Sequence, residues 1–207
     1  MLRCDRLSGR DTYGEAAMAE PGERRERPKT FPRRIALKDG RVATIRLMVK
    51  KDKDKLLRFF RGIPEEERMF LRDDVTKPET IEAWARDLDY SAILPIVAEI
   101  EGRIVADATL HRRPYGWMQH VAEVRIVVDP AFRGKGLGHA LLAEIVDIAA
   151  TWGMEILVSE LTPEQKPAIK LVKSVGFKRE ATLRRHVKDL SGTPRDLLVL
   201  TRRLTQE

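Results

Sequence analysis

The chain has 207 residues, of which 43% are hydrophobic, and it carries a formal net charge of +7. A chain of this length fits one domain and can bury a substantial core. It contains no run of about 18 uncharged apolar residues, which excludes a membrane-spanning helix, and its amino-terminal segment lacks the apolar core of a secretory signal. Cys4 is the single cysteine and no Cys/His cluster has zinc-ligand spacing, so we expect a cytoplasmic protein without a metal.

The positive charge is spread along the chain. Residues 1–34 hold nine Lys or Arg and six Asp or Glu, which leaves a net +4 for the remainder. No basic run is interleaved with aromatic residues, as a platform for single-stranded nucleic acid would require. We therefore do not expect nucleic acid as a partner; salt-dependent retention on DNA would indicate the opposite.

Residues 1–34 differ in composition from the rest of the chain. They are rich in Arg, Glu, Gly and Pro and show no sustained apolar periodicity. Such a segment buries too little apolar surface to offset the entropy of ordering it, so we predict a disordered or flexible tail. Residues 35–207 then form one domain.

That domain shows both strand-like alternation and helical amphipathic patterns. In chain order they predict a strand over 41–49, helices over 50–61, 64–71 and 78–88, strands over 93–100, 103–110 and 121–128, a helix over 138–152, a strand over 155–160, a helix over 165–174, and a closing hairpin of strands over 178–188 and 195–203. This order indicates an α/β domain with a mixed sheet.

The strongest local signal follows the predicted strand over 121–128. The chain passes through Asp129-Pro130 and a glycine-rich turn into a helix, with the residues Arg133, Gly134, Lys135, Gly136, Leu137, Gly138 and His139. Glycines allow positive φ and close approach of a ligand to the backbone, and the first amides of a helix bind anions. The turn therefore predicts a phosphate site, to which Arg133 and Lys135 add positive charge.

Other readings of this turn are weaker. A Walker loop requires Gly-Lys followed by Ser or Thr, and that triplet is absent. The dinucleotide fingerprint requires G-x-G-x-x-G, whereas the glycines here lie at 134, 136 and 138. A strand-to-helix turn without a ligand stays open as the simplest alternative.

Arg133-x-x-Gly136-x-Gly138 resembles the Q/R-x-x-G-x-G/A signature of the GNAT superfamily of acyl-CoA-dependent N-acetyltransferases. A second family landmark, N-x-x-A-I-x-L-Y-x-x-x-G-F, is similar to the segment from Gln165 to Phe177. The resemblance covers residues 35–207 and implies a single GNAT-type domain, with a mixed, mostly antiparallel central sheet flanked by helices. It also implies that the turn binds the coenzyme A pyrophosphate and that Gln165 contacts the cofactor. The acetyl carbonyl and pantetheine arm are expected on the backbone of Ile126, Val127 and Val128.

The second landmark departs from the family at two positions. Gln165 stands where many relatives have Asn, and it can still donate and accept hydrogen bonds. Val172 stands where many have the Tyr that protonates the departing thiolate, and valine has no proton to give. The general acid therefore stays open, with Ser174 and water as alternatives.

Acetyl transfer to an amine requires the neutral form of the amine, so a base is expected. Glu123 and Glu160 are the candidates, because each lies on a strand that borders the expected groove. The context of Glu123 resembles bacterial Pat-type protein-lysine acetyltransferases, in which this strand glutamate is the general base. Glu160 instead matches the glutamate of ribosomal-protein N-terminal acetyltransferases. Partial desolvation predicts a raised carboxyl pKa at such a position, whereas a glutamate simply paired with a neighbouring Arg or Lys is the structural alternative.

The sequence thus predicts an enzyme that moves an acetyl group from acetyl-CoA to a primary amine by direct attack in a ternary complex. The acceptor is a protein amine (a lysine or an N-terminus) or a small molecule such as a polyamine, an amino acid or an antibiotic. A non-catalytic acyl-CoA sensor is the alternative, since the usual Tyr is missing. Some relatives are dimers, which leaves a homodimer open, and no membrane partner is expected.

Overall fold

The computed structural model describes residues 31–113 and 115–204. The predicted tail lies outside the described residues as far as residue 30. The elements are β1 (Arg33–Ala36), β2 (Val42–Leu47), η1 (Lys50–Asp52), α1 (Lys53–Arg61), α2 (Glu65–Arg68), α3 (Pro78–Arg86), β3 (Ile93–Ile100), β4 (Arg103–Arg112), β5 (Val121–Val128), η2 (Pro130–Phe132), α4 (Leu137–Thr151), β6 (Ile156–Leu161), α5 (Lys166–Ser174), β7 (Lys178–Lys188) and β8 (Pro194–Arg203).

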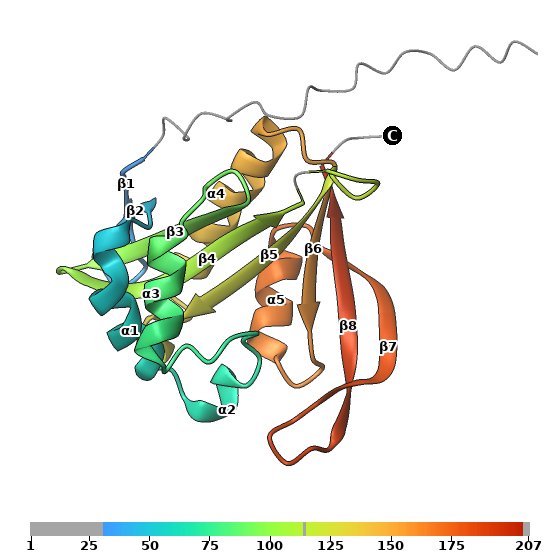
Figure 1. Cartoon of the computed structure of the whole chain (residues 1–207). Helices are drawn as coiled ribbons and strands as arrows, with labels where there is room; N and C mark the ends of the chain where they lie inside the picture. Colours follow the sequence, from blue (N-terminus) through green and yellow to red (C-terminus); the bar gives the residue numbers. More distant parts are fainter. Residues whose placement is uncertain (1–30, 114, 205–207) are drawn as a thin grey trace, which may run out of the picture.

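The strands form one sheet in the order β1-β2-β3-β4-β5-β6-β8-β7. Every neighbouring pair is antiparallel except β5 and β6, which run parallel. Helices α1 and α3 cover one face, and α4 and α5 lie on the other (Figure 1). The prediction of a mixed, mostly antiparallel sheet flanked by helices is confirmed.

Helix α4 supplies the centre of the larger core. Its apolar face is buried, each residue being at most 5% exposed: Leu141, Leu142, Ile145 and Ile148, together with Trp152 just after the helix. Its residues pack against the even-numbered positions of β3 and β4, because side chains alternate across a strand. The odd-numbered positions face α1 and α3 instead, where Val97 joins Leu56 and Phe60 in a second core. Beyond the register shift at Ala98/Glu99 the order in β4 reverses, so that Val105 belongs to the first core and Ile104 to the second.

The structure differs from the sequence expectation in three segments. Arg33 and Arg34, assigned above to the tail, belong to β1, and Arg33 pairs with the buried Glu144 of α4. The helix expected over 50–61 opens as the 3₁₀ turn η1 before α1. The helix expected over 64–71 ends at Arg68, and the next three residues line the cavity described below instead of extending α2.

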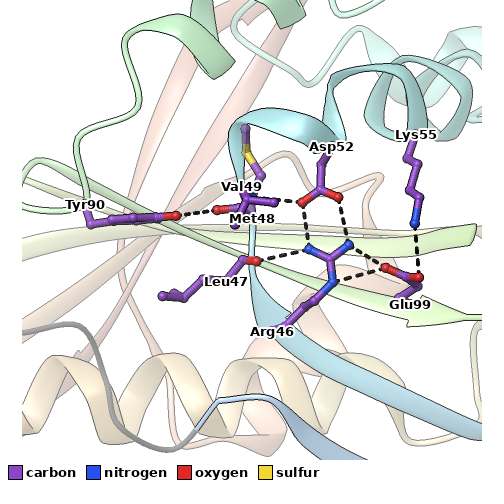
Figure 2. A network of polar contacts seen from close by, with 8 residues as sticks. All are labelled: Arg46, Leu47, Met48, Val49, Asp52, Lys55, Tyr90 and Glu99. Carbon is purple, nitrogen blue, oxygen red and sulfur yellow. Dashed lines mark hydrogen bonds and ion pairs between the residues drawn. The ribbon is translucent and has the colours of Figure 1, made fainter. Parts of the chain in front are cut away.

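A polar network anchors η1 and α1 to the sheet (Figure 2). Arg46 of β2 donates to both carboxylate oxygens of Asp52, at 2.6 and 2.8 Å, and also pairs with Glu99 of β3. Asp52 in addition accepts the Val49 N–H at 2.9 Å, and Lys55 of α1 pairs with Glu99 at 3.1 Å. The Asp52 side chain is 5% exposed, so these bonds supply the partners that a buried charge needs.

We predict that Asp52→Asn lowers the free energy of unfolding by about 2 kcal/mol at pH 7, because it removes one of the two carboxylates that bind the Arg46 guanidinium. In Asp52 burial raises the pKa, but Arg46 and the Val49 N–H outweigh it and lower the pKa overall; Arg46 likewise lowers the pKa of Glu99. Groups with lowered folded-state pKa values stabilise at neutral pH and lose that contribution as pH falls through those values. Urea unfolding from about pH 6 to about pH 3 should therefore show a shallower acid loss in the variant; equal slopes would contradict this.

Candidate active site

The glycine turn has the conformation expected of an anion site. Gly134 has φ +71° and Gly136 φ +92°, values that side chains with a Cβ rarely adopt. Gly138 is needed for another reason, because a Cβ there would lie 2.8 Å from the Leu171 side chain of α5. Within the described residues, the N–H groups of positions 134–139 have no backbone acceptor, and they open at the N-terminus of the 15-residue helix α4.

The two cations of the turn are already paired. Arg133 donates to both oxygens of Glu67 in α2, at 2.8 and 2.5 Å, and to the Val128 carbonyl at 2.9 Å. Lys135 pairs with Asp39 at 3.1 Å. The positive charge expected at the turn is thus partly balanced by carboxylates, and a phosphate bound at the turn would compete with Glu67 for Arg133.

Strands β5 and β6 separate shortly after they meet. Their register consists of Val121↔Ile156, Ala122↔Leu157 and Glu123↔Val158. The remaining five residues of β5, which include Ile126, Val127 and Val128, have no partner on that side within the described chain. Their backbone groups are therefore free to bind an extended ligand, as the sequence predicts for the pantetheine arm and the acetyl carbonyl.

One cavity of about 1650 Å³ joins the turn to this gap and continues to both sides of it. Arg133, Gly134, Gly136, Gly138 and His139 line its turn end. Beyond the gap it is bounded by α1, α3, the segment 63–75 and the β7–β8 hairpin. The cofactor site and a second, acceptor-sized space therefore belong to a single cavity.

Glu123 and Glu160 meet at the point where β5 and β6 separate. Arg72 bridges them, with Nη2 at 2.8 Å from a carboxylate oxygen of each, and Arg125 binds Glu123 through two further bonds of 2.8 and 3.1 Å. The sequence brings both candidates to one place, but it did not identify Arg72 or Arg125 as their partners. Between them the two carboxylates already hold a cation.

The expected rise in the pKa of Glu123 is wrong. Burial does raise this pKa, but the hydrogen bonds and charge of Arg125, with the charge of Arg72, outweigh it and lower the pKa overall. Glu123 is thus a strand glutamate paired with arginines, as in the structural alternative given above, and it lies inside the candidate site.

Three polar residues of β4 lie on the same sheet face and were not recognised in the sequence. Asp107, Thr109 and His111 stand opposite Val127, Arg125 and Glu123 respectively, and all six line the cavity. The sequence did contain a sign of Asp107, because this residue interrupts an otherwise apolar stretch of β4. Burial raises the pKa of Asp107 to about 7 and lowers that of His111 to about 4. His111 Nε2 lies 2.9 Å from the Thr109 hydroxyl.

The second landmark forms α5 and the turn before it. Gln165 is the N-cap residue of α5, where its Oε1 accepts the Thr162 N–H at 2.9 Å, and it also lines the cavity. Val172 is 1% exposed and belongs to the core beneath α4. Ser174, the alternative acid, donates to the Leu171 carbonyl at 2.7 Å and lies 3.1 Å from His139.

The comparisons with known proteins agree with this geometry. The model of the acetyltransferase (GNAT) family matches residues 53–177. YwnH of Bacillus subtilis (strain 168), provisionally named as a phosphinothricin acetyltransferase, is 28% identical over 78% of this chain and 99% of its own. The crystal structure of the GNAT domain of S. lividans PAT has a TM-score of 0.70 at 22% identity, covering 86% of this chain and 99% of that chain. The structure of yncA from Salmonella typhimurium with its cofactor acetyl-CoA has a TM-score of 0.68 at 22% identity, covering 80% and 95%.

The chain belongs to the GNAT family of acetyltransferases, because the family model matches more than half of it. It is an acyl-CoA-dependent N-acetyltransferase, and acetyl-CoA is its cosubstrate. Within residues 31–113 and 115–204, no group of His, Cys, Asp and Glu side chains could hold a metal. No helix of this described part is long and apolar enough to cross a membrane.

We predict that Gly136→Asp abolishes acetyl-CoA binding, because it places an anion against the pyrophosphate position. Gly102→Asp is the matched control, since Gly102 has a similar φ of +75° but lies in the β3–β4 turn, outside the cavity lining. Calorimetric titration should show binding by the control and none by Gly136→Asp. Retained affinity in Gly136→Asp would overturn the assignment of the turn.

Glu67→Gln should tighten acetyl-CoA binding about two- to fivefold, the range expected for releasing one part-exposed ion pair. The reason is that Arg133 no longer needs to leave a carboxylate before it contacts the phosphate. Glu65→Gln on the same short helix is the control, since Arg133 pairs with Glu67. Equal dissociation constants for wild type and Glu67→Gln would show that Glu67 does not compete.

Proposed function

We propose that this enzyme acetylates the primary amine of a small molecule, by direct attack of the amine on the thioester of acetyl-CoA in a ternary complex. The observation that carries the proposal is the continuity of the cavity. The phosphate turn, the gap between β5 and β6 and the space under α1 and α3 form one enclosure. Both substrates can be bound at the same time, so the transfer does not require a covalent acetyl-enzyme intermediate.

The atoms balance in a direct transfer. The acceptor ammonium loses one proton, its nitrogen forms a bond to the thioester carbon, and the carbon–sulfur bond breaks. The second proton of the attacking nitrogen goes to the leaving sulfur or to water, because the buried Val172 has none to give. Backbone N–H groups in the unpaired part of β5 are suited to stabilise the oxyanion of the tetrahedral intermediate.

Glu123 is the proposed proton acceptor, with Glu160 as its neighbour at the same point. Arg72 is 52% exposed and holds both carboxylates, which supports a site for a cationic group at this place. An ammonium that displaces Arg72 would lie between the side chains of Glu123 and Glu160. Proton transfer to a carboxylate with a lowered pKa is uphill, so the reaction relies on the amine being close to the thioester rather than on a strong base.

A small acceptor is favoured over a protein lysine by two facts. The space on the acceptor side is lined largely by buried apolar residues, as expected for a small-molecule pocket. YwnH, which is matched over nearly its whole length, is named for phosphinothricin, a small amine. Tyr115 and Trp117, exposed at 79% and 90%, lie outside the cavity lining.

The test is release of the CoA thiol from acetyl-CoA with a panel of phosphinothricin, L-amino acids, linear amines and lysine peptides. We expect at least one small amine to outperform every peptide, and intact-protein mass spectrometry to show no acetylated enzyme during turnover. Acetyl-CoA binding without thiol release on any amine would overturn the proposal, as would faster turnover of a peptide.

Glu123→Gln should lower turnover about 100-fold at pH 7, as loss of a proton acceptor does, with acetyl-CoA affinity unchanged. Because the Glu123 pKa is lowered, the wild-type rate should rise between about pH 7 and about pH 9 with deprotonation of the amine, not of this carboxyl. Steady-state rates across this range test both points. Unchanged turnover in Glu123→Gln with a loss in Glu160→Gln would transfer the role to Glu160.

A further inference from the structure

Two buried hydroxyl groups on the β6 side of the gap have no part in the reaction described above. Ser159 of β6 is 4% exposed, and Thr162, which follows the end of β6, is 5% exposed. Both residues line the cavity. Among the described residues, neither hydroxyl has a hydrogen-bond partner. Buried hydroxyls in proteins are normally hydrogen-bonded, so these two indicate a hydrogen-bonding ligand in the cavity.

Ser159 lies at the point where the gap opens. The last paired residues of the two strands are Glu123 and Val158, so Ser159 is the first residue of β6 without a β5 partner. The phosphate turn follows Val128, at the other end of the unpaired part of β5. For an extended cofactor whose phosphates bind at the turn, Ser159 is thus at the acyl end.

The side chain of Ser159 is on the face of the sheet that α4 and α5 cover. Side chains alternate along a strand, so Ser159 shares its face with Leu157, whereas Glu160 lies on the other face, where Arg72 binds it. Leu157 belongs to the core that also contains Val172 of α5, and α5 lies against β6 (Figure 1). The hydroxyl and the two glutamates therefore reach the same end of the gap from opposite faces.

The other groups beside the gap are less suited to donate a hydrogen bond at its acyl end. Val172 has no polar side-chain atom, and the Ser174 hydroxyl already donates to the Leu171 carbonyl at 2.7 Å. Thr162 lies three residues beyond Ser159, and three residues of extended chain span about 10 Å. Thr162 is therefore placed along the arm of the cofactor, and Ser159 is the buried hydroxyl at the acyl end.

We propose that the Ser159 hydroxyl donates a hydrogen bond to the sulfur of acetyl-CoA and stabilises the negative charge that the sulfur gains as it leaves. This rests on the proposed function, in which the amine attacks from the face of Glu123. Glu123 takes the first proton of the ammonium, the amine nitrogen forms a bond to the thioester carbon, and the carbon–sulfur bond breaks with its electron pair left on sulfur. Ser159 keeps its proton, and the second proton of the nitrogen goes to water.

Such a donor is fixed in place before the reaction but meets a full charge only as the bond breaks. It therefore accelerates the chemical step more than it strengthens binding. Ser159→Ala should lower kcat at least about tenfold, whereas the dissociation constant of acetyl-CoA should change less than about twofold, since the sulfur of the intact thioester is a weak acceptor. Ser159→Thr, which retains a hydroxyl, should keep most of the wild-type kcat.

The matched control is Thr201→Val on the neighbouring strand β8. Thr201 stands opposite Val158 of β6, but its hydroxyl donates to Glu180 and the residue is outside the cavity lining. This variant should retain the wild-type kcat. Ser159→Ala is expected to fold as the wild type does, because the hydroxyl that it removes has no partner in the described part of the chain.

A second readout needs neither an amine nor turnover. CoA itself carries the free thiol, and its ionisation in the complex can be followed by the ultraviolet absorbance of the thiolate as the pH is raised. Because Ser159 stabilises the thiolate, CoA bound to Ser159→Ala should require a pH about one unit higher for the same ionised fraction, which is the tenfold effect expressed as an equilibrium. In Thr201→Val and Ser159→Thr the thiol should ionise as in the wild type.

The outcomes separate the two proposals. An unchanged kcat in Ser159→Ala, or equal thiol ionisation in this variant and the wild type, would overturn the role of Ser159 and leave the acetyltransferase proposal standing. An equal loss of kcat in Thr201→Val would also overturn it. If the wild type acetylates no amine, but ionisation of the bound thiol still depends on Ser159, the proposed reaction fails and the hydrogen bond to sulfur is retained.

Discussion

The separation of β5 from β6 is the constraint on which the rest of the site depends. A sheet normally satisfies its backbone groups through the neighbouring strands, and an open internal edge is unfavourable unless something covers it. Here the parallel pair holds for three residues and then parts, while the antiparallel pairing of β5 with β4 continues through Val128. An extended ligand could take the place of the missing strand, and the candidate site residues lie along that gap.

One short segment connects the two ends of the gap. Residues 62–77 carry Glu67, which binds Arg133 of the phosphate turn, and Arg72, which binds Glu123 and Glu160. The two contacts involve opposite charges. Glu67 places a carboxylate where the phosphate is expected, and Arg72 places a guanidinium where the substrate ammonium is expected. The segment therefore occupies, with groups of matching charge, the two places where the phosphate and the amine are expected.

Much of this structure could be predicted from local sequence patterns. The strand over 121–128, the glycine turn and the helix that follows were recognisable because conformational demands at Gly134 and Gly136 and the apolar stripe of α4 are properties of contiguous residues. The close packing of Gly138 against Leu171 could not be predicted in this way, because it depends on where α5 packs. The same is true of Arg72, which lies 51 positions from Glu123 and 88 from Glu160. The wrong direction for the Glu123 pKa has a different main cause: Arg125, two positions along the same strand, binds the Glu123 carboxylate through two hydrogen bonds, and the distant Arg72 adds to its effect.

Two buried carboxylates on the α1 side of the sheet show how stability and function divide. Asp52 is fully partnered by Arg46 and the Val49 N–H, and its role ends with fixing α1 to β2 and β3. Asp107 is almost as buried, yet its strand neighbours are apolar and its pKa is raised to about 7 by burial. The partners of Asp52 show that this fold can supply hydrogen bonds to a buried carboxylate. Asp107 therefore contributes no side-chain hydrogen bond to the fold within the described residues, and it lines the cavity instead.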